Sequence, residues 1–273
     1  MKLFINEFAK DYKKISTYLY FLISFAILFI VNFANTRGDI SQVQGYHLIV
    51  ELLNVVTSIS YIFILIMFAN NLSQEYSRGT IKFLYSKPKS RSSILTTKIF
   101  LAIFNYFLFT LILVAFDFIL KYFVFYKGKI NLHTVFTEKL GEENFNRIVW
   151  QHLGIIFLAS LVTVLFYISL VLLICVLFKT QILSLVVVLV MVLAGGAISG
   201  LSTLIIPKFE YIKYIFTNIQ SLPSYYISFN GRTIIEEAFK LNGRSLLLMA
   251  LAYTVFFTLV SYIVNARRDI TLS

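Results

Sequence analysis

Six apolar runs, each long enough to cross a membrane as a helix, constrain this chain more than any other feature of its sequence. A span takes about 20 predominantly apolar residues, because the hydrocarbon core of a bilayer is about 30 Å thick. Runs this long and unbroken do not suit the alternating strands of a membrane β-barrel. The sequence therefore predicts an all-α polytopic membrane protein whose six transmembrane helices cover about Ile15 to Phe33, Leu48 to Leu72, Ile94 to Leu120, Leu153 to Phe178, Ile182 to Ile206 and Leu246 to Val264.

The composition agrees with a membrane protein of one domain. Of the 273 residues, 59% are hydrophobic and 14% are charged, more apolar than a soluble fold can hide. The six spans leave roughly 150 residues, too few for an added soluble catalytic domain of ordinary size. No linker or internal repeat divides residues 1–273. Glu7 and Asp11 stand where a signal peptide would be basic, so we expect the first run to be retained as a helix.

The meaning of the net charge of +11 depends on where the lysine and arginine residues lie along the chain. Basic residues beside hydrophobic spans are typical of a cytoplasmic membrane face, so no nucleic-acid partner is expected. With six spans both termini lie on one side, and the density of lysine and arginine favours the cytoplasm for both.

Motifs for catalysis are missing from the sequence. We find no G-x-x-x-x-G-K-[ST] nucleotide loop, no H-E-x-x-H and no C-x-x-C, and the single cysteine, Cys175, lies among apolar residues. We therefore expect no catalytic residues, no metal site and no cofactor bound by this chain, which predicts that it is not an enzyme.

The first fourteen residues have the pattern of an interfacial helix. Phe4, Phe8 and Tyr12 recur every four residues, while Lys10, Lys13 and Lys14 can face anionic lipid. A plain basic tail is the alternative.

The segment that joins the second and third spans, residues 73–93, is too polar to span and too long for a turn. Glu75, Arg78 and Lys82 share one helical face, and Tyr76 and Phe83 share another, which predicts a short amphipathic helix along the membrane. Pro88 ends this helix. Taken by itself, the segment is better explained as an ordinary basic loop on the cytoplasmic side.

One part of the sequence resembles a segment of ABC-2 type transporter permeases. It consists of the run from Gln74 to Leu84, followed by Lys87-Pro88, Ser90-Arg91 and Lys98. The ending Asn265-Ala266-Arg267-Arg268-Asp269-Ile270 is similar to the tail of the bacitracin and lantibiotic immunity branch. The resemblance implies a bacterial-type plasma membrane, an elbow helix over residues 1–14, and a coupling helix that is seated in a separate ABC ATPase, which would hold the ATP and Mg²⁺. It also implies a second permease subunit, identical or different, and a second ATPase contact near Phe178 to Gln181. The ATPase-coupling residues it implies are Glu75, Tyr76, Arg78, Gly79, Thr80, Lys82, Pro88, Arg91 and Lys179.

Polar residues within the spans mark a candidate substrate path. One stripe on the second span holds Glu51, Asn54, Ser58 and Tyr61, and one face of the third span holds Tyr106, Thr110 and Asp117. These stripes could line a translocation path. For Glu51 and Asp117, near the outer ends of their spans, the alternative is an interfacial carboxylate that reaches water.

Small residues on the fifth span allow close helix packing. The candidate seam between two permease subunits consists of Gly195, Gly196, Ser199 and Gly200, with packing inside one subunit as the alternative. The aromatic-rich residues 207–245 are expected at the external interface, where the resemblance implies short re-entrant helices.

Together these features predict a permease subunit of an ATP-driven exporter that moves an amphipathic peptide or a lipophilic antibiotic. The alternatives are a sensor or immunity protein that binds a peptide or partner without transport, and a secondary transporter. The spans hold almost no charge near their middles, which argues against the secondary transporter.

Overall fold

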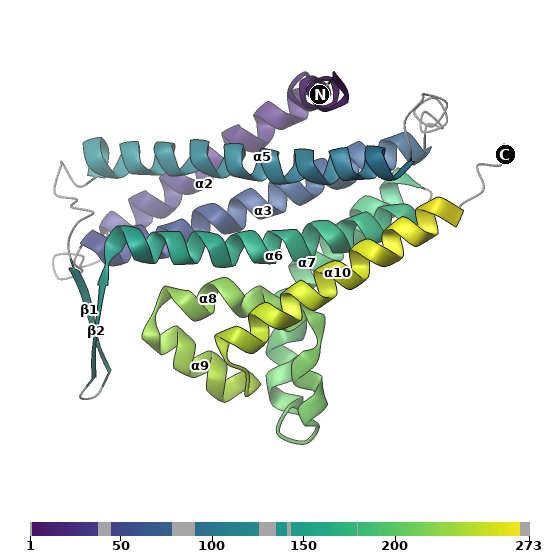
Figure 1. The fold of residues 1–273 in the computed structure, drawn as a ribbon. Helices are drawn as coiled ribbons and strands as arrows, with labels where there is room; N and C mark the ends of the chain where they lie inside the picture. Colours follow the sequence, from purple (N-terminus) through teal and green to yellow (C-terminus); the bar gives the residue numbers. More distant parts are fainter. Residues whose placement is uncertain are drawn as a thin grey trace.

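A computed structural model describes residues 2–37, 45–77, 91–125, 135–140, 143–178 and 180–267 (Figure 1). The order of elements is α1 (Lys2–Tyr12), α2 (Ile15–Arg37), α3 (Gly45–Ser77), α5 (Arg91–Ile119), the π-helix η2 (Leu120–Phe125), β1 (Val135–Leu140), β2 (Glu143–Ile148), α6 (Val149–Leu177), α7 (Gln181–Ile205), the 3₁₀-helices η3 (Glu210–Tyr214) and η4 (Phe216–Ser221), α8 (Leu222–Ile227), α9 (Phe229–Phe239) and α10 (Gly243–Arg267).

Six of these helices are long and apolar enough to cross a membrane, which confirms the predicted class of fold. The spans lie in α2, α3, α5 with η2, α6, α7 and α10. Outside them, β1 and β2 form an antiparallel hairpin in which Val135 is opposite Ile148. The chain is therefore a multi-pass, all-α membrane protein with one short hairpin between its third and fourth spans.

Two helices run further than the apolar runs suggest. α3 continues through Ser77, and α5 starts at Arg91. Residues 73–77 of the predicted coupling segment therefore belong to the last turn of α3, while residues 78–90 lie outside the described part of the chain.

α6 is the central helix of the bundle. Its sequence is apolar on every face, as expected for a helix surrounded by protein, and Ile156, Phe166 and Leu172 are fully buried. In Figure 1 α10 crosses α6 on one side, and α3 and α5 run beside it on the other.

Residues 207–245 fold into short helices against the membrane helices. Ser228 accepts a hydrogen bond from the backbone N–H of Gly231 and so caps α9, and Lys240 ends α9 in the left-handed conformation. His152, in the first turn of α6, lies 2.7 Å from the carbonyl oxygen of Ile227. α8 thus lies alongside the first half of α6, and α9 packs on α8 (Figure 1).

Candidate functional site

The predicted coupling residues are only partly within the described structure. Glu75 and Tyr76 lie in the last turn of α3, and Arg91 is the first residue of α5. Arg78, Gly79, Thr80, Lys82, Pro88 and Lys179 lie outside the described residues. Their contacts therefore stay predictions.

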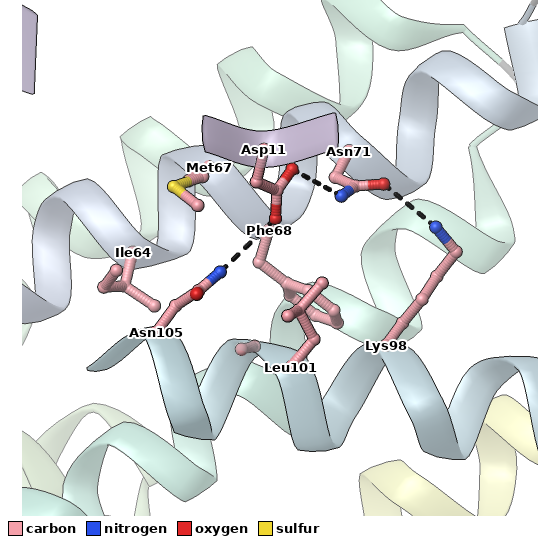
Figure 2. A pocket seen from close by; sticks show the side chains of 9 residues that line it. Asp11, Ile64, Met67, Phe68, Asn71, Lys98, Leu101 and Asn105 are labelled. Atoms are coloured by element: carbon pink, nitrogen blue, oxygen red, sulfur yellow. Dashed lines mark hydrogen bonds between the residues drawn. The ribbon is translucent and has the colours of Figure 1, made fainter. Parts of the chain in front are cut away.

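A buried polar cluster connects the two helices that flank this segment. Lys98 of α5 donates hydrogen bonds to Oδ1 of Asn71 on α3 and to Oε2 of Glu7 on α1, each at 2.9 Å. Asp11 of α1 accepts hydrogen bonds from Nδ2 of Asn71 at 2.7 Å and from Nδ2 of Asn105 on α5 at 3.3 Å. We call these five residues the elbow cluster, because they fasten α1 to α3 and α5; Figure 2 shows Asp11 between the two asparagines.

All five side chains are removed from solvent, with exposed fractions between 2% and 7%. Lys10 and Lys14 add charge on the same side of α1, 3.9 Å from Glu7 and 3.8 Å from Asp11. Buried charges must be paired and hydrogen-bonded to be tolerated. The cluster meets that condition only while α1 stays docked.

The two carboxylates of α1 differ electrostatically. Burial raises the pKa of Asp11, since amide donors and Lys14 compensate its charge only in part. Burial acts in the same direction on Glu7, but the charge and hydrogen bond of Lys98 lower the pKa of Glu7 below its ordinary value. Glu7 is therefore the charge partner of Lys98, whereas Asp11 mainly accepts from the asparagine amides.

Beside Asp11 lies a cavity of about 10 Å³, lined also by Asn71, Lys98 and Asn105. Among the described residues, the buried Oδ1 of Asn105 has no hydrogen-bond partner. A space of this size, lined by these polar groups and by apolar side chains, fits one water molecule and no larger ligand. The chemistry of the cluster is therefore to hold helices together rather than to bind a substrate.

Aromatic contacts extend the docking of α1 along α5. The ring of Phe4 lies 5.7 Å from Phe100 and 5.6 Å from Phe104, and Phe8 lies 5.8 Å from Phe104. The predicted helix with phenylalanine every four residues is present. Its rings pack on α5, and Glu7 and Asp11, which sequence reasoning did not assign to a site, turn inward. Two signals in the sequence could have indicated Glu7 and Asp11. The two carboxylates are four residues apart, and Asn71, Lys98 and Asn105 are polar residues within apolar runs.

The predicted substrate path is divided between separate surfaces. Tyr61 stacks on Tyr167, with ring centroids 5.6 Å apart, and accepts a hydrogen bond from Gln220. Tyr106 and Thr110 are buried on α5, where Tyr106 stacks on Phe157. Asn54 and Ser58 are half-buried on α3, and the side chain of Glu51 lies outside the described residues. Within the described part of the chain, Tyr61 thus contacts Tyr167 and Gln220, whereas Tyr106 contacts Phe157.

Asp117 is buried within the protein. It pairs with Lys121 one turn later and accepts a hydrogen bond from Nδ2 of Asn32 on α2 at 2.8 Å. With an exposed fraction of 6%, it does not have the open access to water of an interfacial carboxylate. The pair satisfies both charges within the bundle.

The four candidate seam residues face in two directions. Gly195 and Ser199 are buried, and a Cβ atom on Gly195 would lie 2.8 Å from Oε1 of Gln220 and 3.4 Å from the hydroxyl of Tyr167. Gly196 and Gly200 are exposed, and no atom lies within 4 Å of a Cβ built on Gly200. Gly195 therefore serves packing inside this chain, whereas Gly196 and Gly200 lie on the exposed face of α7.

These observations define a six-span membrane protein with an N-terminal helix fastened to two of its spans. A model of one protein family matches residues 5–271, and the chain belongs to that family, DUF2705, which is described as proteins of unknown function. No curated protein matches the chain. Among the residues that the structure describes, no group of three or more His, Cys, Asp or Glu side chains could hold a metal ion.

Proposed function

We propose that this protein is the membrane-spanning permease subunit of an ATP-driven ABC exporter. It would work with a separate ATPase chain, which holds ATP and Mg²⁺, and with a second permease subunit. Its place is the plasma membrane of a bacterial-type cell with both termini in the cytoplasm. Its cargo is an amphipathic peptide or another lipophilic molecule, because the spans offer apolar surface and few charges.

The elbow cluster is the observation that carries this proposal. A partner bound at residues 78–90 would move the end of α3 and the start of α5. Asn71 lies six residues before the end of α3, and Lys98 lies seven residues after the start of α5. The two side chains are hydrogen-bonded to each other and to α1. Motion of the segment would therefore pass to three helices together, as ATP-driven rearrangement requires.

The second predicted contact with the ATPase also lies next to this region. Gln181, the first residue of α7, donates a hydrogen bond of 2.7 Å from Nε2 to Oδ1 of Asn70 on α3. The turn between α6 and α7 is thus tied to the same end of α3 as the elbow cluster. Both proposed contacts would act on one end of the bundle, the end at which α10 finishes (Figure 1).

Co-expression with a candidate ABC ATPase chain tests the proposal. We expect the two chains to co-purify and ATP hydrolysis to rise with amphipathic peptides. Arg78→Ala and Gly79→Pro should keep membrane insertion but abolish this stimulation, because they change the contact with the ATPase. Lys208→Ala, an exposed cation after α7, is the control and should behave as wild type.

The result also separates the proposal from a sensor or immunity protein. A protein that binds peptide tightly, yet neither co-purifies with an ATPase nor changes ATP hydrolysis, would contradict the exporter and support the sensor.

A further inference from the structure

The 3₁₀-helix η4 lies deep in the bundle, near the middle of three spans. Its first residue, Phe216, packs on Phe166 of α6 and on Phe257 of α10, in both cases with ring centroids 6.2 Å apart. Its residue Gln220 donates a hydrogen bond of 3.4 Å to the hydroxyl of Tyr61 on α3. Tyr61, Phe166 and Phe257 each lie ten or more residues, about 15 Å or more, from both ends of their helices. η4 therefore reaches the depth of the hydrocarbon core, where bulk water does not satisfy polar groups.

The polar side chains of η4 are unequally satisfied. Asn218 accepts a hydrogen bond of 2.9 Å from Ser202 of α7, and Ser221 donates one of 2.6 Å to the carbonyl oxygen of Asn218. Within the described part of the chain, by contrast, Oγ1 of Thr217 and Oε1 of Gln220 are buried without a hydrogen-bond partner. These two residues are three positions apart and so share one face of the 3₁₀-helix. An acceptor left unpaired at this depth is costly, and a donor from outside the chain would relieve that cost.

The carboxamide of Gln220 lies against two glycines of α7. A Cβ atom on Gly195 would lie 2.8 Å from Oε1, so the missing side chain of Gly195 makes room for the carboxamide. Gly196 is exposed, and a Cβ atom built there would lie 4.0 Å from the same oxygen and meet no other atom within 4 Å. The unpartnered oxygen therefore lies close behind the exposed face of α7, and a small turn of the side chain would present it to a ligand on that face.

On α3, the same place continues the predicted substrate path. Tyr61, the hydrogen-bond partner of Gln220, ends the stripe that begins with Asn54 and Ser58, and these side chains are half-buried. A peptide in an apolar environment has the need that complements this site, because each backbone N–H without an acceptor is costly there. Pairing such an N–H with Oε1 of Gln220 would satisfy both groups.

We propose that Gln220 is a recognition residue for a peptide cargo, which donates a hydrogen bond from a backbone N–H to Oε1. Tyr61 accepts from Nε2 of the same carboxamide and so holds its orientation. The identity of the cargo rests on the proposed function, although the binding step itself needs no ATPase. Because Gly196 also belongs to the candidate seam, the bound peptide would lie between the two permease subunits.

Equilibrium binding of two tritiated peptides to the purified full-length protein in lipid nanodiscs tests this role. The probe is an apolar tripeptide with an acetylated amino end and an amidated carboxyl end, acetyl-Leu-Phe-Leu-amide. Its analogue carries methyl groups in place of every hydrogen on nitrogen. Binding to empty nanodiscs is subtracted, because both peptides partition into lipid. We expect wild type to bind the probe about tenfold more tightly than the analogue, the effect of one well-placed hydrogen bond.

Two variants remove the acceptor in different ways. Gln220→Met keeps the unbranched shape and should bring the two affinities to within about twofold of each other. Gln151→Met is the matched control, an exposed glutamine in the first turn of α6, and should keep the wild-type preference. Gly195→Ala leaves Gln220 in place, but its methyl group would push the carboxamide aside, so the preference should fall here too. This variant carries the test if Gln220→Met is not recovered folded.

Two outcomes would overturn the role of Gln220. One is a wild-type protein that binds the two peptides equally or binds neither saturably. The other is a folded Gln220→Met protein that keeps the wild-type preference. A preference that depends on Gln220, in a protein that never stimulates an ATPase, would support the recognition residue and contradict only the exporter. ATPase coupling without any preference between the peptides would contradict only the recognition residue.

Discussion

At the scale of single residues, the two carboxylates of α1 make unequal contributions to its docking. Glu7 compensates the buried charge of Lys98, so Glu7→Gln should weaken the docking of α1 by about 3 kcal/mol. Asp11→Asn should change it by less than about 1 kcal/mol, because Asn105 can rotate and offer its unpartnered Oδ1 to the new amide. The mobility of a spin label at Lys13→Cys, in a Cys175→Ser background, measures docking. Equal mobility in the two variants would contradict the assignment of Glu7 as the partner of Lys98.

Neighbouring glycines of α7 allow a second test at this scale. Gly195→Leu should destabilise the folded chain by about 1 to 3 kcal/mol, since the new side chain would collide with Gln220 and Tyr167. Gly196→Leu faces outward and should leave the stability of one subunit unchanged. Thermal unfolding in detergent at concentrations that keep the protein monomeric compares them. A larger loss for Gly196→Leu would mean that the inward face of α7 is assigned wrongly.

At the scale of elements, α1 is a helix whose docking depends on pH. The pKa of Glu7 is below its ordinary value of 4.5, so its contribution is complete above that value and is lost as pH falls through the folded-state pKa. The pKa of Asp11 is raised, so its buried charge disfavours docking at high pH and protonation removes that cost. We therefore expect α1 to stay docked from about pH 8 to pH 5 and to be released only below pH 4.5. The same spin label follows the transition, and Glu7→Gln should abolish the acid release.

The sequence predicts the elements better than their contacts. The six spans follow from the length of the apolar runs, and α1 follows from the spacing of Phe4, Phe8 and Tyr12, because both properties are local. The elbow cluster joins residues up to 94 positions apart, and no local pattern states that Asp11 meets Asn105. The polar stripe of α3 shows the same limit. Periodicity placed Asn54, Ser58 and Tyr61 on one face, but the partners of that face were set by how α6 and α7 pack on it.

At the scale of the whole molecule, two outward surfaces carry open glycines on different helices. Gly154 lies on an exposed part of α6, and Gly196 and Gly200 lie on the exposed face of α7. Exposed apolar residues alone do not separate these surfaces, because every lipid-facing helix has them. The small residues on α7 differ in allowing another helix to approach its backbone closely, as the seam with a second permease would require.

Replacing Gly196 and Gly200 together by leucine tests that seam. Leucine suits the bilayer, and a Cβ atom meets open space at Gly200 and only Oε1 of Gln220, at 4.0 Å, at Gly196. Insertion and folding should therefore survive while the close approach of a second α7 is blocked. Crosslinking between copies through Leu193→Cys, on the same exposed face and in the Cys175→Ser background, should give a dimer band that the double-leucine change removes. Gly154→Leu is the control and should keep the band, because this open glycine lies on α6 and not on α7. A dimer band that survives the double-leucine change would place the seam elsewhere and leave Gly196 and Gly200 facing lipid. A band lost both in the double-leucine variant and in Gly154→Leu would mean that the exposed surfaces of α6 and α7 are not independent.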